Sequence, residues 1–303
     1  MADRGNRRPQ LAVMNAVHDL PVLVARDEGY FRDEGLDIEF VTTPGMAQVA
    51  STHVAKFESV FDRPLDSAFN DGGIDQYRMC EWGIMKRAVE ADAQHLRKRK
   101  IVALGASMSS FAIVVAGDGP IYEPEQLKDK PIAVTPNNGS HFTTLKMMEG
   151  FLTPEHIKTT NFGSMPERIK AMRDGKVAAV SLMEPWISVA QKSGLRILIE
   201  THSTRSEAAS DDLDGKTLAA MFRAQARAVK TLEKDPTPYA HYFVTETGGL
   251  LEAKDLQTWR LLHAPPQPYT RERFDDTYTW TRKWNLVVPG ATYETVVDNR
   301  AWQ

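Results

Sequence analysis

The 303-residue chain contains a single cysteine, Cys80. One cysteine can form neither an intramolecular disulfide nor a thiolate metal cluster. The eight histidines are scattered without the spacing of a metal site. G-x-G-x-x-G, Walker lysine, H-E-x-x-H and G-x-S-x-G motifs are also missing, which removes the usual nucleotide, metalloprotease and serine-hydrolase signatures. We therefore expect no metal and no cofactor.

An excess of positive charge is also missing, because 37 lysines and arginines stand against 40 acidic residues, for a net charge of -3. The chain therefore lacks the basic footprint of a nucleic-acid partner. No apolar run approaches the about 18 residues of a membrane-spanning helix, so we expect no direct membrane insertion. The apolar run at residues 11–14 is shorter than the apolar core of a signal peptide, which has about 7 to 15 residues. A complete N-terminus predicts a cytoplasmic protein, and a removed signal peptide predicts a periplasmic one.

Strand and helix patterns alternate along the chain, which favours an α/β fold. Residues 11–15 form a short apolar strand, residues 20–31 have helical spacing, Gly35 ends the helix, and residues 36–40 alternate as a strand. Further strands are expected at residues 76–80, 100–105, 111–116, 131–134, 157–162, 177–183 and 195–200. Further helices are expected at residues 46–61, 81–91, 140–150, 166–174, 185–193, 213–234 and 279–287. The polar residues 201–212 are expected to form a loop.

The segment LPVLVARDEGYFRDEGLDIEFV, residues 20–41, closely resembles the opening of the nitrate/sulfonate/taurine-type solute-binding proteins. EPEQLKDK, residues 123–130, resembles the turn before the first strand of their second lobe. The resemblance implies an α/β, two-lobed, type II periplasmic-binding-protein fold with a ligand cleft between the lobes. It places residues 1–110 and 201–303 in lobe 1 and residues 111–200 in lobe 2. Two hinge crossovers are expected near residues 109–116 and 197–205, and the segment 48–67 is longer than usual in the family.

Ligands of open α/β sheets bind beyond the carboxyl ends of the strands, so the residues that follow each strand are the candidates for binding. These residues are Asn15, His18, Asp19, Cys80, Glu81, Trp82, Asn138, Gly139, Ser140, His141, Glu184 and Trp186. The turn at residues 138–141 opens a helix whose free N–H groups suit an anion, although Ser140 is equally explained as the cap of that helix.

The other candidates leave the chemistry of the ligand open. Glu81 and Glu184 are expected to face one another across the cleft, which favours a ligand with N–H donors or a positive charge. Each is equally explained as compensation of a helix N-terminus. Trp82 and Trp186 suit either stacking on a flat ligand or the core.

Two functions remain open on these residues. The first is a protein that binds a small polar or heteroaromatic molecule, with an ABC permease as partner if it is exported. The second is a cytoplasmic lyase or hydrolase with Cys80, Glu81, His18 and His141 as nucleophile, acid or base. The sulfinate desulfinases resemble this fold and use a cysteine, but their Arg-x-Gly-Gly motif is absent. The fungal-type thiamine-pyrimidine synthases also open similarly, but Asp19 stands where they have a histidine, and their cysteine-rich iron-binding run is missing. We place the binding protein marginally ahead.

Overall fold

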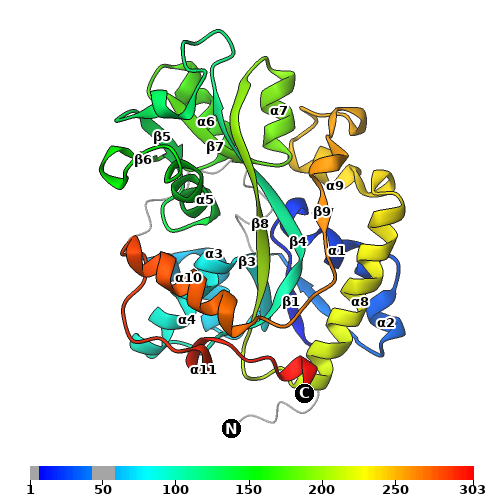
Figure 1. Cartoon of the computed structure of the whole chain (residues 1–303). Helices are drawn as coiled ribbons and strands as arrows, with labels where there is room; N and C mark the ends of the chain where they lie inside the picture. The colour runs from blue at the N-terminus through cyan, green and yellow to red at the C-terminus, as the bar shows by residue number, and fades with distance from the viewer. Residues whose placement is uncertain (1–6, 43–58) are drawn as a thin grey trace.

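The computed structural model describes residues 7–42 and 59–303. Within them a single mixed sheet of nine strands forms the centre of the molecule (Figure 1). The strands are β1 Gln10–Ala12, β2 Glu39–Val41, β3 Gln76–Cys80, β4 Lys100–Val115, β5 Pro131–Val134, β6 Lys158–Asn161, β7 Ala179–Met183, β8 Arg196–Ala209 and β9 Leu262–His263. The helices are α1 Ala16–Asp27, α2 Tyr30–Asp33, α3 Pro64–Asn70, α4 Glu81–Ala93, α5 Gly139–Met148, α6 Met165–Arg173, α7 Trp186–Lys192, α8 Gly215–Lys234, α9 His241–Glu246, α10 Arg271–Lys283 and α11 Tyr293–Val296.

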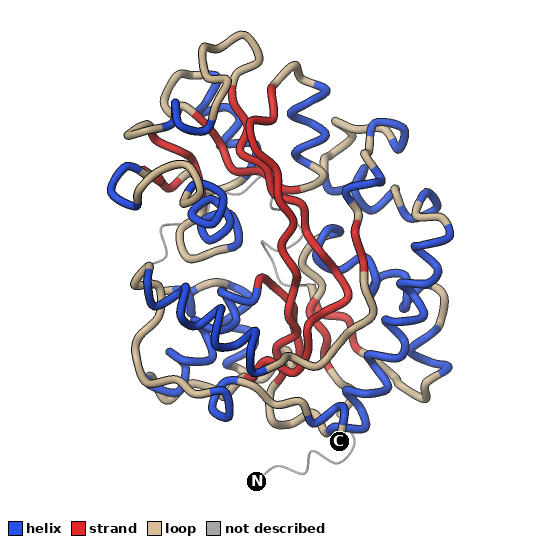
Figure 2. The backbone as a smooth tube through the Cα atoms, viewed as in Figure 1, coloured by secondary structure: helices blue, strands red, loops and turns tan. Residues whose placement is uncertain are grey.

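Two long antiparallel strands, β4 and β8, join the two lobes. The strand order is β2-β1-β3-β8-β4-β7-β5-β6, and β9 pairs with β4. We call the part around β1, β2 and β3 the first lobe and the part around β5, β6 and β7 the second lobe. Figure 2 shows β4 and β8 running side by side from one lobe into the other. The predicted crossovers at residues 109–116 and 197–205 lie in these two strands, apart from Ala116. The residue limits of the two lobes stay a prediction.

The pairing of β4 with β8 is irregular in the first-lobe part of the two strands. Leu104 pairs with Ser206 and Met108 with Thr204, so β4 carries extra residues at this point. Gly105 lies in this bulge, where an added Cβ would be 3.1 Å from Oε1 of Glu207. The irregularity therefore brings the backbone of β4 close to the charged side chains of β8.

Several predicted elements are confirmed, and β3 and β5 have the predicted limits. The helix predicted at residues 20–31 is instead two helices, α1 and α2, because Gly29 adopts a φ of 75° between them. The runs at 100–105 and 111–116 belong to one strand, β4. The helix predicted at 46–61 and the extension at 48–67 lie largely outside the described residues; from residue 59 on, a short 3-10 turn, Val60–Asp62, precedes α3.

The loop predicted at residues 201–212 is wrong, because β8 continues to Ala209. The prediction rested on the polar side chains of residues 201–212, because a polar run is typical of a loop. In the structure β8 lies between β3 and β4, and four of those polar residues are buried there: Ser203, Arg205, Ser206 and Glu207. No helix among the described residues is long and apolar enough to cross a membrane.

Candidate functional site

Two neighbouring cross-strand pairs of β3 and β8 define the candidate site. Arg78 lies opposite Glu207, and Cys80 lies opposite Arg205. Residues i and i+2 of a strand share one face of the sheet, so the two pairs lie side by side. Helix α1 contributes one side chain to each pair, because Asp19 binds Arg78 and His18 contacts Arg205.

In the first pair the cation has two carboxylate partners. Arg78 is buried and binds Asp19, both carboxylate oxygens of Glu207 at 3.2 and 3.3 Å, and the carbonyl oxygen of Ala12 at 3.0 Å. Gln76 donates a further bond of 3.0 Å to Glu207. Burial lowers the pKa of Arg78, but the charges of Glu207 and Asp19 outweigh burial and raise the pKa above its ordinary value. This pair therefore has a structural role, and Asp19 is part of it.

The second pair lacks a carboxylate. Arg205 is 1% exposed, and its Nε and Nη2 donate to the carbonyl oxygen of Ser203 at 3.3 and 3.2 Å. No carboxylate among the described residues lies within ion-pair distance of it. Burial lowers the pKa of Arg205 to about 10. A buried cation without a counter-ion within ion-pair distance is costly, so an anion from outside the protein would be stabilised at this position.

His18 is a neutral hydrogen-bonding neighbour of Arg205. Its Nε2 lies 3.2 Å from Nη1 of Arg205, and because a guanidinium only donates, Nε2 is the acceptor. The proton of the neutral ring therefore resides on Nδ1, a buried atom with no partner among the described residues. Burial, followed by the charges of Arg205 and Arg78, keeps the pKa of His18 well below its ordinary value. His18 therefore offers a free N–H donor beside Arg205.

The N-terminus of α5 approaches Arg205 from the second lobe. A Cβ added to Gly139 would lie 3.6 Å from Nη1 of Arg205, an ordinary contact, and 3.0 Å from Cζ of Phe111, which is tight. The predicted cap Ser140 is wrong, since Asn138 is the N-cap and accepts from the Gly139 N–H at 2.6 Å. Ser140 instead accepts from the backbone N–H of Thr135 at 3.0 Å.

Arg63 is a second cation at this junction of the lobes. It precedes α3 in the first lobe and donates 2.7 Å from Nη2 to the carbonyl oxygen of Pro136 in the second lobe. Its Nε is buried without a partner among the described residues. Burial, with the nearby charge of Arg87, lowers the pKa of Arg63 to about 10. Arg63 thus contacts Pro136, three residues before Gly139, the first residue of the helix that approaches Arg205.

The two glutamates predicted to face the ligand are already paired within the protein. Glu81 binds Arg273 at 2.8 and 3.0 Å and accepts from Tyr269 at 3.0 Å. Glu184 accepts from the hydroxyl of Ser188 at 3.1 Å and from Arg260 at 3.3 Å. The expectation of a cationic ligand rested on these carboxylates, and their internal partners remove its support.

The remaining predicted residues lie around the lobe junction or in the core. Trp82 is 8% exposed and packs against Phe142 and Trp280, with ring centroids 6.2 and 5.5 Å away. Trp186 is buried, and its Nε1 has no partner among the described residues. His141 accepts from the backbone N–H of Asn137 at 3.2 Å, and burial lowers the pKa of His141 to about 4. Asn15 caps α1 by accepting from the His18 N–H at 3.0 Å.

Cys80 is buried at the start of α4. Burial raises the pKa of its thiol, although Arg205, the backbone N–H of Gly83 and Arg87 act in the opposite direction. A nucleophilic cysteine is activated by a lowered pKa or by an adjacent base. The thiol of Cys80 therefore lacks a lowered pKa, and Cys80 lies opposite Arg205 in the β3–β8 ladder.

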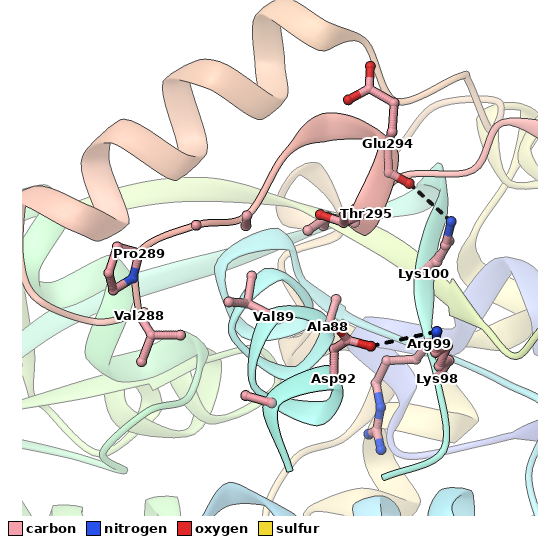
Figure 3. Close-up of a pocket in the computed structure, with 14 residues that line it drawn as sticks. Ala88, Val89, Asp92, Lys98, Arg99, Lys100, Val288, Pro289, Glu294 and Thr295 are labelled. Atoms are coloured by element: carbon pink, nitrogen blue, oxygen red, sulfur yellow. Dashed lines mark hydrogen bonds and ion pairs between the residues drawn. The ribbon is translucent and has the colours of Figure 1, made fainter. Parts of the chain in front are cut away.

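A separate pocket of about 400 Å³ lies between α4, the start of β4 and α11 (Figure 3). Its lysines already have partners, since Lys98 pairs with Asp92 at 3.7 Å and Lys100 donates to the carbonyl oxygen of Glu294 at 3.0 Å. Lys98 and Asp92 are also exposed. Among the described residues, no group of three or more potential metal ligands comes together.

The residues that carry the site, Arg205 and Arg63, are absent from the sequence-based candidates. Arg205 lies in the stretch interpreted as a loop, where Ser203, Arg205 and Glu207 alternate with the period of a strand. That alternation was an available signal. Arg63 lies in the unusual extension, and nothing in its local sequence points to the lobe junction.

The fold is that of two-lobed periplasmic binding proteins. The chain is similar to the alkanesulfonate-binding protein SsuA from Xanthomonas axonopodis pv. citri bound to MOPS, with 16% identity over 96% of this chain and 98% of that chain and a TM-score of 0.73. It is similar to the periplasmic aliphatic sulphonate binding protein SsuA from Escherichia coli, with 16% identity, 99% and 100% coverage and a TM-score of 0.71. The desulfurization enzyme DSZB matches at 13% identity, 97% and 98% coverage and a TM-score of 0.56. No protein-family model and no curated sequence matches the chain. The predicted fold class is thus confirmed, and at these identities the likeness concerns the fold alone.

Proposed function

We propose that this protein binds a small organic anion of the sulfonate type at the junction of its two lobes. The observation that carries the proposal is Arg205, a buried guanidinium with no carboxylate partner among the described residues. An oxyanion accepts charge-assisted hydrogen bonds from such a group and supplies the missing negative charge.

The surroundings of Arg205 favour an anion in three further ways. His18 provides a neutral N–H donor, the N-terminus of α5 brings its positive dipole end next to Nη1, and Arg63 adds a second positive charge. These groups come from both lobes. Ligand binding would therefore draw the lobes together, with β4 and β8 as the connecting strands.

The structural relatives support a transport role. Two of them are sulfonate-binding proteins, and one is described as periplasmic. We accordingly infer a periplasmic location and an ABC permease as partner. Fractionation of cells that express the complete gene product tests the location: recovery with a periplasmic marker is expected, and recovery only with cytoplasmic markers would contradict it.

Calorimetry with ethanesulfonate as probe tests the binding site. We expect saturable binding to the wild type and an affinity lower by about 100-fold in Arg205→Met, because the main charge-assisted contact is lost. Arg173 is exposed, so Arg173→Met is the matched control and should bind as the wild type does. Equal affinity in Arg205→Met and the wild type would refute the proposed site.

Mass spectrometry distinguishes a binding protein from an enzyme. Native and denaturing spectra of the purified protein are expected to show an organic anion that leaves unchanged and no adduct on Cys80. A covalent mass on Cys80, or conversion of the released compound by fresh protein, would establish catalysis instead and contradict a purely binding role.

A further inference from the structure

A group of three arginines in the first lobe contains one carboxylate among the described residues. Arg87 of α4 and Arg99, the residue before β4, both pair with Oδ1 of Asp66, at 2.7 and 2.9 Å. These three side chains are buried. Arg63, the third arginine, precedes the helix that carries Asp66 and has no carboxylate partner within the described ranges. We call these four residues the arginine cluster, and its positive charges outnumber its negative charge by two.

Two arginines of the cluster have donor atoms without partners. Nη2 of Arg87 and Nε of Arg63 are buried and meet no acceptor in the described part of the chain. The two guanidinium groups also repel each other, because the charge of Arg87, after burial, lowers the pKa of Arg63. The Arg99 guanidinium instead lies over the rings of Phe61 and Phe69, with centroids 5.2 and 4.4 Å away. An external acceptor with a negative charge would therefore be stabilised at Arg63 and Arg87.

Cys80 lies between the arginine cluster and Arg205. It is the cross-strand partner of Arg205 in the β3–β8 ladder, and the Cβ atoms of such partners are about 4.5–5.5 Å apart. On its other side, a Cβ added to Gly83 would lie 3.0 Å from Sγ of Cys80 and 3.5 Å from Nη1 of Arg87. Burial raises the pKa of the thiol, and the charges of Arg205 and Arg87 both act against burial. The two positions of positive charge are therefore separated by the width of one side chain.

Arg63 and Arg205 also border one turn of the second lobe, the turn between β5 and α5. Nη2 of Arg63 donates to the carbonyl oxygen of Pro136 at 2.7 Å, and the Cβ position of Gly139 is 3.6 Å from Nη1 of Arg205. Three residues separate these two contacts, and three residues span at most about 11 Å of chain. A ligand bound against this turn would therefore lie near both cations.

We propose, on the basis of the anion site described above, that the ligand is a dianion with a sulfonate group at Arg205 and a carboxylate group at Arg63 and Arg87. A ligand with one negative charge would leave the excess charge of the arginine cluster uncompensated. A carboxylate accepts charge-assisted hydrogen bonds from guanidinium groups, whereas an ammonium group would be repelled by them. Cys80, a neutral side chain, lies between the two positions.

Calorimetry with sulfoacetate, 3-sulfopropanoate and 4-sulfobutanoate, each beside its uncharged amide, tests the second position. We expect the carboxylate of the best-fitting length to bind the wild type about 10-fold more tightly than its amide, which has the same size but lacks the charge. In Arg63→Met this ratio should fall to about 1, and in Arg63→Lys, which keeps the charge, most of it should remain. The ratio compares two ligands of one variant, so a general change in sulfonate affinity cancels. The exposed Arg173→Met is the matched control and should keep the ratio.

Binding of ethanesulfonate together with a ratio near 1 at all three lengths would overturn the dianion proposal and leave the anion site intact. A ratio that survives unchanged in Arg63→Met would also overturn it, as would tighter binding of 3-aminopropanesulfonate than of 3-sulfopropanoate. Absence of binding by ethanesulfonate and by every sulfocarboxylate would refute the anion site itself, and the dianion proposal with it. The melting temperature of each variant shows whether it is folded, and the wild-type comparison decides the proposal without any variant.

Discussion

Arg78 and Arg205 are neighbours on one face of the β3–β8 ladder, yet they have opposite electrostatic surroundings. Arg78 binds two carboxylates, whereas Arg205 faces a thiol, a neutral imidazole and its own strand's carbonyl group. Both are buried. Burial of an arginine alone therefore does not indicate its role; the number of its counter-ions distinguishes a structural cation from a candidate ligand-binding one.

The largest expected effect follows from removal of the paired cation. Arg78→Met leaves Asp19 and Glu207 buried without their partner and should lower the free energy of unfolding by about 3–5 kcal/mol. Urea denaturation measures this change. Arg205→Met leaves no carboxylate unpaired and should lower the free energy of unfolding much less. Equal decreases in the two variants would contradict the difference between the two arginines.

The second prediction converts the Arg205 position into a copy of the Arg78 position. Cys80→Asp places a carboxylate opposite Arg205, and we expect this internal anion to weaken ethanesulfonate binding by about 100-fold without unfolding the protein. Cys80→Ser, which keeps a neutral side chain, is the control. Unimpaired binding by Cys80→Asp would show that Arg205 does not hold the anion.

The third prediction concerns the pH dependence of stability. The pKa of Glu246 is raised from 4.5 to about 7 in the folded protein, so between these values the folded state retains a proton that the unfolded state has lost. Its contribution to stability is therefore present at low pH and is lost as the pH rises toward 7. Between pH 4.5 and pH 7 the free energy of unfolding should fall less in Glu246→Gln than in the wild type. The difference between the two decreases should be about 1–2 kcal/mol.

Urea denaturation at several pH values in this window checks the difference. Other titrating groups contribute equally to both proteins and cancel in the comparison. Parallel curves for the wild type and Glu246→Gln would mean that this carboxyl group titrates normally.

The smallest expected effect comes from the second-lobe side of the site. Gly139→Ala places a Cβ at 3.0 Å from the ring of Phe111, which forces the N-terminus of α5 slightly away from Arg205. We expect ethanesulfonate binding to weaken by about 3- to 10-fold, or roughly 1 kcal/mol. Gly150→Ala, where the nearest atom would be 3.8 Å away, should have no effect on binding. Unchanged affinity in Gly139→Ala would indicate that α5 does not contact the anion.

Local patterns in the sequence identified most elements and the general position of the site. Short-range rules govern the end of a helix at Gly35, the helical spacing of residues 20–31 and the strand at residues 76–80. These features could therefore be interpreted from the sequence. Asn138 and Gly139 were placed at a helix start for the same reason. The loop assigned to residues 201–212 was wrong because local polarity does not reveal that a strand is buried between two others.

The sequence by itself determined the α/β class, the two-lobed fold and the strand ends from which the ligand would be approached. Only the tertiary structure decided which charges are neutralised. Arg78 meets Asp19 and Glu207, which lie 59 and 129 residues away in the chain, and Glu81 meets Arg273 at a separation of 192 residues. Charge pairing depends on distances of a few ångströms in space, and a position in the chain does not encode which distant segment will supply the counter-ion. Arg205 became recognisable as a candidate ligand-binding residue only when those pairings were known.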